Sequence, residues 1–184
     1  MSHLTVYADS DPSAPLLDTG DGGRIAEALA RIDVRFERWP ARTHLSAAAT
    51  DQEVLDRYGP EITKLKAAGG YQAVDVARVR PDQAGLEPLR AKFLSEHRHD
   101  EDEVRFFVEG AGLFCLREQG RVHLALCEAG DMISVPAGIR HWFDMGPTPR
   151  FTAIRLFTSP EGWVARYTGD PIAEAFPRFE PTPA

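Results

Sequence analysis

Several features that would narrow the function of this 184-residue sequence are scarce or absent. No apolar run approaches the roughly 18 residues of a membrane-spanning helix, so we expect no membrane partner. The first residues, MSHLTVYADSD, lack a basic segment followed by an apolar stretch, which argues against a secretory signal and favours the cytoplasm. With 21 basic against 28 acidic residues, the net charge of −7 disfavours nucleic acid as a partner.

Cysteine occurs only twice, as Cys115 and Cys127. Their spacing does not fit a C-x-x-C site, and both lie in apolar, strand-like stretches. A disulfide is the alternative, but we expect two buried, reduced thiols. The composition, 43% hydrophobic and 27% charged, is that of a soluble globular protein, and the length predicts one domain over residues 1–184.

The first half of the chain mixes strands and helices. Thr50, followed three residues later by Glu53, predicts a helix N-terminus, Pro60 begins a new helical turn, and Gly69 and Gly70 end it, which together predict a helix pair. A loop rich in Gly, Asp and Pro follows the first predicted strand. The other predicted elements are strands at 3–8, 34–39 and 71–79 and helices at 24–32 and 86–96.

From about residue 97 to 166, short apolar segments alternate with turn signals. Residues 118–121 (EQGR) indicate a hairpin turn, and residues 127–131 another break. The predicted strands are 104–110, 112–118, 121–127, 132–136, 141–145 and 150–157. This spacing predicts a mainly β protein, an antiparallel jelly-roll barrel with a few peripheral, mostly N-terminal helices.

The stretch HRHDEDEVRFFVEG, residues 97–110, carries potential metal ligands. His97 and His99 are two residues apart, so in extended chain their side chains point to the same side. Glu103 and Arg105 share strand parity, which directs a carboxylate and a cation toward the same interior. Taken alone, the stretch is equally compatible with a solvated turn, and residues 100–102 are expected to form one.

A second stretch, GDMISVPAGIRHWF at 130–143, favours the metal interpretation because it supplies a fourth donor, His141, from another strand. The combined pattern is His97-x-His99-x3-Glu103-x6-Gly110, then Gly130-x5-Pro136-x-Gly138-x2-His141. It resembles the two motifs of the cupin superfamily, a small β-barrel with a central metal. The sequence departs from those motifs at Ala91, where glycine is expected, and at Met145, where asparagine is expected. Neither position supplies a ligand.

Three imidazoles and one carboxylate leave two octahedral positions open, which indicates a substrate site rather than a closed structural zinc site. Such donors accept Fe, Ni, Mn, Co or Zn. The remaining histidines have no ligand-type neighbours at useful spacing, so we expect surface or packing roles for His3, His44 and His123.

Arg155 shares strand parity with Phe151, Ala153 and Phe157, which predicts a cation inside an apolar barrel. An anionic substrate would neutralise it, and Arg105 raises the same question. Pairing with an internal carboxylate, or a bulge that turns the side chain outward, is the alternative for both arginines.

Aromatic residues crowd this region, and most are expected in the core. Phe143 has the parity of His141, and Phe93 lies just upstream of the first ligand, so either could wall an apolar part of a substrate. Trp163 is a third candidate, without a parity argument.

The runs HRHDEDEVRFFVEGAGLF, GDMISVPAGIRHWFD and IDVRFERW, with Arg155 and Gly162-Trp163, resemble the bacterial acireductone dioxygenases of methionine salvage. The resemblance implies one Fe(II) or Ni(II) per chain, held by His97, His99, Glu103 and His141. It implies the substrate 1,2-dihydroxy-5-(methylthio)pent-1-en-3-one and O2. The Fe(II) form would yield 4-methylthio-2-oxobutanoate and formate, and the Ni(II) form 3-methylthiopropanoate, formate and carbon monoxide.

The resemblance also implies that Arg105 generates and holds a substrate dianion, that Glu96 assists metal incorporation, and that Asp102 relays conformational change. From the residues alone, Glu96 and Asp102 are ordinary turn residues. We expect a monomer. Two alternatives stay open, namely another cupin dioxygenase with a thiol or enol substrate, and a non-catalytic cupin that binds a small molecule or a metal.

Overall fold

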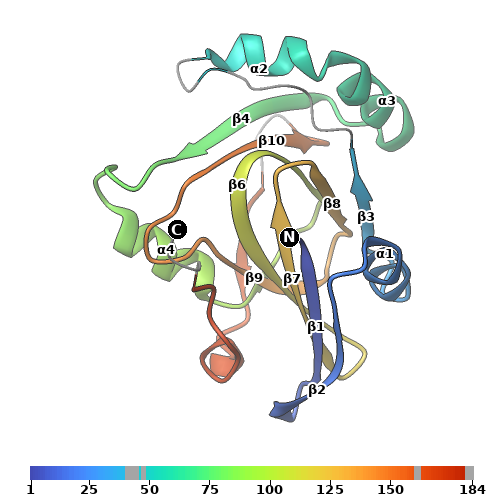
Figure 1. Cartoon of the computed structure of the whole chain (residues 1–184), viewed down its shortest axis with the longest axis vertical. Coiled ribbons are helices and arrows are strands. Elements are labelled where there is room, and N and C mark those ends of the chain that lie inside the picture. The colour runs from blue at the N-terminus through green and yellow to red at the C-terminus, as the bar shows by residue number, and fades with distance from the viewer. Residues whose placement is uncertain (40–45, 47–48, 160–162, 181–184) are drawn as a thin grey trace.

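The computed structural model describes residues 1–39, 46, 49–159 and 163–180. Strands dominate, and the helices lie around them (Figure 1). The strands are β1 His3–Ala8, β2 Asp11–Thr19, β3 Arg35–Arg38, β4 Ala73–Val79, β5 His97–Arg98, β6 Glu103–Glu118, β7 Arg121–Glu128, β8 Asp131–Val135, β9 Arg140–Asp144, β10 Phe151–Phe157 and β11 Arg166–Tyr167. The helices are α1 Gly22–Ala30, α2 Asp51–Arg57, α3 Gly59–Gly69, α4 Leu86–Leu94 and the 3₁₀ helix η1 Pro171–Glu174. None of these helices is long and apolar enough to cross a membrane.

The strands form two antiparallel layers that share β6. One layer has the order β11-β5-β9-β6-β7-β1-β2, and in the other β6 lies between β8 and β10, with β3 and β4 outside them. This arrangement confirms the predicted mainly β fold with few helices.

The strand β6 is unbroken over Glu103–Glu118, although the sequence predicts two strands there. Where β6 passes β10 the register shifts, because Ala153 pairs with Phe107 and Thr152 with Glu109. The extra residue is Val108, which makes a β-bulge. The bulge changes which parity faces inward, so that Phe107 before it and Phe114 after it both pack in the interior cluster.

Gly110 follows the bulge and has a φ of +74°. A Cβ at this position would lie 1.8 Å from the carbonyl oxygen of Arg150, so no larger residue fits without movement of the backbone. The motif glycine therefore allows β6 to bend from one layer into the other.

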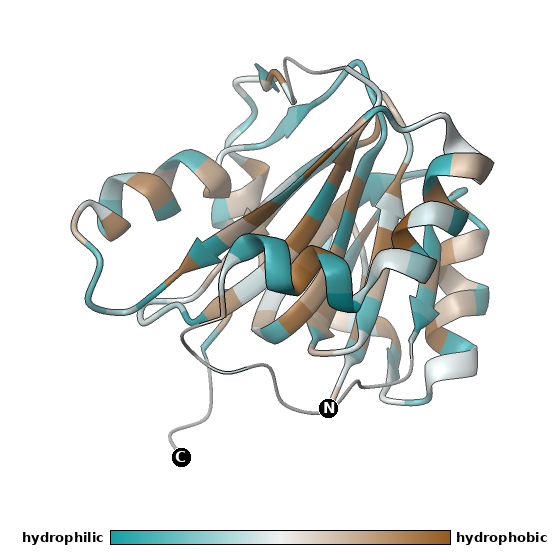
Figure 2. Cartoon of the chain, turned by 90° about the horizontal axis from the view of Figure 1, so that it is seen from above, coloured by the Kyte–Doolittle hydropathy of each residue, from teal (hydrophilic) through white to brown (hydrophobic). Residues whose placement is uncertain are grey.

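Among the described residues, hydrophobic side chains form three clusters, one between the layers and one on each outer face. Figure 2 shows many hydrophobic positions, in brown, along the central strands. Helices α2 and α3 cover one outer face by packing Val54, Tyr58 and Ile62 near Phe106. The other outer face is covered by the C-terminal segment, where Phe176 lies 6.1 Å from Trp142 between ring centroids. Both faces of the central strands are thus buried, which explains their continuous apolar runs.

The local predictions for the helix pair and the main hairpin are confirmed. Thr50 and Glu53 form a reciprocal capping box at α2, and Gly70 ends α3 with a φ of 68°. Gln119 and Gly120 both have positive φ between β6 and β7, as a tight hairpin turn requires. The predicted helix at 86–96 is shorter and ends at Leu94.

The predicted loop after the first strand is wrong, because β2 occupies Asp11–Thr19. This strand is the edge of its layer and pairs only with β1 among the described residues. An edge strand leaves half of its N–H groups unpaired, so Pro12 and Pro15 are tolerated. The exposed position also removes the alternating apolar pattern by which a strand is predicted.

Both cysteines are free and buried, as predicted. Burial raises the pKa of the Cys115 and Cys127 thiols well above the usual value. Thiols in such surroundings are inert.

Asp144 ties three parts of the fold together from the end of β9. Its buried carboxylate accepts hydrogen bonds from Arg90 Nε at 2.7 Å and Nη2 at 3.0 Å, and from the backbone N–H groups of Gly146 and Phe179, each at 2.9 Å. Burial raises the pKa of this carboxyl, but these hydrogen bonds outweigh burial and hold its pKa below the usual value.

We expect Asp144→Asn to lower the free energy of unfolding at pH 7 by about 2–4 kcal/mol, because it leaves Arg90 without its buried partner. A carboxyl whose pKa is lower in the folded than in the unfolded protein stabilises the fold at pH values above its unfolded pKa. This contribution is lost as the pH falls through the folded pKa. The deficit should therefore shrink below about pH 4. Urea denaturation at pH 7 and at low pH measures it, and an equal deficit at both would contradict this account.

Candidate metal centre

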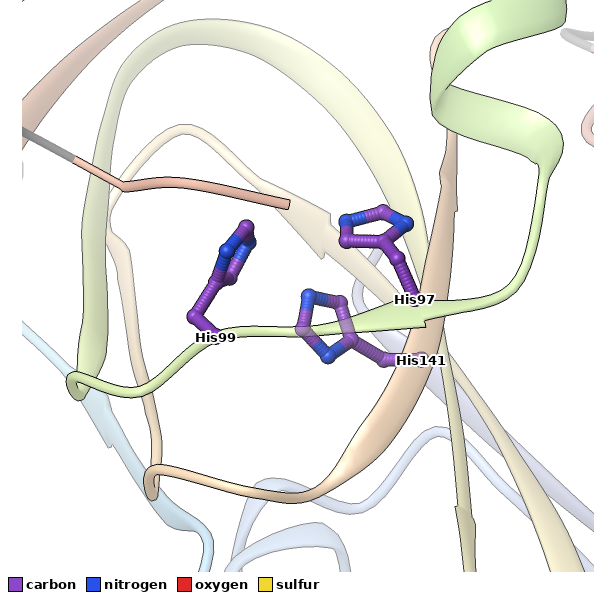
Figure 3. Close-up of side chains that lie close together, drawn as sticks. All are labelled: His97, His99 and His141. Carbon is purple, nitrogen blue, oxygen red and sulfur yellow. The ribbon is translucent and has the colours of Figure 1, made fainter. Parts of the chain in front are cut away.

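Three buried histidines converge between β5 and β9. His97 and His141 are directly paired across these strands, and His99 follows β5. One ring nitrogen from each lies within 4.8 Å of the others. Figure 3 shows the three imidazoles turned toward one another from the two chain segments. The structure therefore brings together the three histidines that the sequence predicts as ligands.

Each imidazole has its Nδ1 within hydrogen-bonding distance of a backbone carbonyl. The pairs are His97 with Ser95 at 2.7 Å, His99 with Val164 at 3.0 Å and His141 with Ile139 at 2.8 Å. Because a carbonyl only accepts, Nδ1 carries the hydrogen, and the lone pair of a neutral ring lies on Nε2. Metal-binding histidines are commonly oriented in this way.

Glu103 lies against the same cluster. Its Oε2 is 3.2 Å from Nε2 of both His99 and His141, and its Oε1 accepts from Arg105 Nη2 at 2.7 Å. Burial raises the pKa of Glu103, but the charge of Arg105 and the contacts with His141 and His99, which would donate to the carboxylate when protonated, hold it well below its usual value. The carboxylate is therefore ionised, with one oxygen facing the imidazoles.

The histidines differ in how easily they accept a proton. Burial, together with the neighbouring His141, lowers the pKa of His97 to about 4. Burial also lowers the pKa of His99, but the hydrogen bond and charge of Glu103 outweigh it and raise this pKa above the usual value. First-row divalent cations accept imidazole and carboxylate donors, and a bound cation replaces any proton on Nε2, so these residues fit such an ion.

Arg105 is buried beside the cluster and is only partly satisfied. Its Nε is buried and has no hydrogen-bond partner among the described residues. Its guanidinium carbon lies 4.7 Å from the ring centroid of Phe143, 5.2 Å from that of Phe114 and 5.4 Å from that of Trp163. A buried donor without a partner is costly, and a bound anion would satisfy it.

Arg155 faces the interior side of β10, as its parity predicts, but it already has a carboxylate partner. Its Nε and Nη2 donate to the two oxygens of Asp75 at 2.8 and 2.6 Å. This is the carboxylate-pairing alternative raised by the sequence. Its contact with a substrate stays a prediction.

The three candidate aromatic residues lie near Arg105 or near one another. Phe93 on α4 packs against Phe143 with ring centroids 6.1 Å apart. Trp163 stacks on His99 at 6.1 Å, and its Nε1 donates to the backbone oxygen of Asp102 at 3.1 Å. The neighbouring Gly162 lies outside the described residues, as does His44.

Glu96 lies in the connection between α4 and β5, but it is not an ordinary exposed turn residue. It is buried, its carboxylate accepts from Thr168 Oγ1 at 2.6 Å, and Arg117 Nη1 lies 3.3 Å away. Asp102 lies in the predicted turn and accepts from the backbone N–H of Ala137 at 3.0 Å.

The other described histidines stay away from the cluster, as expected. His3 pairs with Asp18 at 3.0 Å, and His123 is buried. Sequence reasoning missed Asp75, Arg117 and Thr168. Asp75 carries the one available signal, because it is the only acidic side chain in the predicted strand at 71–79.

Comparison with known proteins gives a consistent result. The sequence profile of the ARD/ARD' family matches residues 3–165. An acireductone dioxygenase from Parvibaculum lavamentivorans is 56% identical over 183 residues and covers 100% of both chains. Acireductone dioxygenase 2 from Pectobacterium atrosepticum is 56% identical over 98% of this chain and 99% of its own.

A solved structure supports the fold. The acireductone dioxygenase from Bacillus anthracis with a cadmium ion in its active centre superposes with a TM-score of 0.81 at 30% identity. The match covers 91% of this chain and 98% of that one. This likeness confirms the predicted cupin-type barrel.

We expect Glu103→Gln to weaken Ni(II) binding by at least about tenfold, because it replaces an anionic donor with a neutral amide. Glu118→Gln, at the far end of the same strand, is the matched control and should bind as the wild type does. Equilibrium dialysis of the metal-stripped proteins measures both affinities. Equal affinity of Glu103→Gln and wild type would exclude Glu103 as a ligand.

Proposed function

The chain belongs to the ARD/ARD' family, and we propose that it is a metal-dependent acireductone dioxygenase. Its substrates would be 1,2-dihydroxy-5-(methylthio)pent-1-en-3-one and O2, in methionine salvage. The observation that carries the proposal is the buried cluster of three imidazoles beside an ionised carboxylate and a partly satisfied guanidinium. Sequence identity of 56% over full length to a named acireductone dioxygenase supports it.

We infer that one Fe(II) or Ni(II) per chain is held by His97, His99, Glu103 and His141. The three Nδ1 contacts to carbonyls and the position of Glu103 Oε2 support this ligand set. A cation bound there would act as a Lewis acid and template for the enediol oxygens. Cadmium in the active centre of the Bacillus anthracis relative agrees with a divalent ion.

Arg105 is proposed to bind the substrate dianion. Its Nε, which has no partner in the part of the chain that the structure describes, is available as a donor, and its positive charge favours the loss of the enediol protons. The rings of Phe114, Phe143 and Trp163 exclude water around the guanidinium. Electrostatic interactions are stronger in such surroundings than in water, so the residue is suited to holding an anion.

The remaining residues are proposed to shape and support the site. Phe93 and Phe143 would line the part of the site that binds the methylthio end of the substrate, and Trp163 and Arg155 would lie at the rim of the site. Glu96 directly precedes a ligand and would assist metal incorporation, and Asp102, which contacts Trp163, would relay conformational change.

Residues 1–184 are proposed to act as one cupin-type domain. We further propose that the chain acts as a monomer in the cytoplasm. Gel filtration and cell fractionation test these two points.

We expect Arg105→Gln to lower kcat/KM for acireductone by about 100-fold or more while the metal content stays near that of the wild type. Arg78→Gln is the control, because Arg78 pairs with Asp51 away from the cluster. Oxygen uptake and elemental analysis on the same samples measure both quantities. Loss of metal with unchanged turnover per bound ion would show that the assigned role is wrong.

The ion with which the metal-stripped protein is reloaded should determine which products form. With Fe(II) we expect 4-methylthio-2-oxobutanoate and formate, and with Ni(II) 3-methylthiopropanoate, formate and carbon monoxide. Product analysis by chromatography, with gas detection of carbon monoxide, distinguishes the two. Oxygen uptake with a thiol but not with acireductone would favour another cupin dioxygenase, and no uptake with either would favour a non-catalytic protein.

A further inference from the structure

We propose that Asp75 is a positioning residue that fixes Arg155 at the rim of the site and weakens the pull of Arg155 on anions. This inference rests on the proposed function, because it concerns an anionic substrate and acidic products. It assigns a role to a residue on β4, a strand that contributes no proposed ligand.

Four charged side chains form a row across three neighbouring strands. Arg105 on β6 is directly opposite Arg155 on β10, and Arg155 is directly opposite Asp75 on β4. Glu103 pairs with Arg105 at one end of the row, and Asp75 pairs with Arg155 at the other. The two positive charges therefore lie next to each other in the middle of the row, with one negative charge at each end.

The two arginines in the middle repel each other. Like charges directly opposite on neighbouring strands are destabilising, and each needs a partner on its far side. Trp163 lies over both, with its ring centroid 5.4 Å from the guanidinium carbon of Arg105 and 5.5 Å from that of Arg155. The bidentate contact with Asp75 holds Arg155 in this position and offsets its charge.

The exposure of the pair sets the size of the effect. The side chain of Arg155 is 31% exposed and that of Asp75 46% exposed, whereas Arg105 is buried. Solvent screens such a pair, so its contribution is modest. Loss of the Asp75 charge would leave a second, uncompensated cation near Arg105, and anions would bind more tightly and leave more slowly.

The test is Asp75→Asn, which keeps the shape of the side chain and one acceptor oxygen but removes the charge. We expect KM for acireductone, and the inhibition constant of 4-methylthio-2-oxobutanoate, to fall about two- to fivefold, with a steeper dependence on salt. Asp51→Asn is the matched control. Like Asp75, Asp51 forms a partly exposed ion pair with an arginine, in this case Arg78 of β4. The control substitution should change neither constant.

Arg155→Gln provides the decisive background. In that variant Asp75→Asn should have no further effect on either constant, because the cation that Asp75 offsets is gone. Unchanged constants in Asp75→Asn, or an equal fall in the Arg155→Gln background, would overturn the proposal.

Failure of the proposed function is a separate result. It would appear as no oxygen uptake by the wild type with acireductone, while quenching of tryptophan fluorescence by 4-methylthio-2-oxobutanoate still compares the variants. Tighter binding of the acid by Asp75→Asn supports the role of Asp75 in either case, and equal binding contradicts it.

Discussion

One buried carboxylate organises the centre of this protein. Glu103 is ionised inside the barrel, where an unpaired charge would be strongly unfavourable, and it is tolerated because a guanidinium and two imidazoles surround it. Its two oxygens face different partners, Arg105 on one side and the histidines on the other. The position of this side chain thus couples the proposed metal ligands to the proposed anion-binding group.

The fold serves that arrangement through β6. The strand begins at Glu103, where it belongs to the layer that includes β8 and β10, and after the bulge at Val108 and the bend at Gly110 it continues between β7 and β9. A single strand therefore carries Glu103 and Arg105 and also pairs with β9, which supplies His141. The three hydrophobic clusters fix both layers around it.

Much of the fold and the centre of the site could be predicted because their signals are local or periodic. The capping box at Thr50, the H-x-H spacing and the shared parity of Glu103 and Arg105 each depend on residues close in sequence. The edge strand β2 could not be predicted, since it is exposed and contains prolines. The bulge at Val108 could not be predicted either, because the glycines that follow it indicate a break between two strands rather than one continuous strand.

The partners of the site residues were the least predictable part. Thr168 and Arg117 reach Glu96 from 72 and 21 residues away, and Asp75 reaches Arg155 across 80 residues. Such contacts depend on strand order and register, which a single sequence does not specify. Parity placed Arg155 correctly on the interior side but left its partner open.

We propose that His97, His99, Glu103 and His141 together bind one divalent cation. The decisive measurement is X-ray absorption of the Ni(II)-loaded protein, combined with metal uptake by the variant in which all four residues are alanine. We expect one nickel per chain, three imidazoles among light-atom ligands, and no comparable uptake by the variant. Fewer imidazoles, a sulfur ligand, or undiminished uptake by the variant would contradict it.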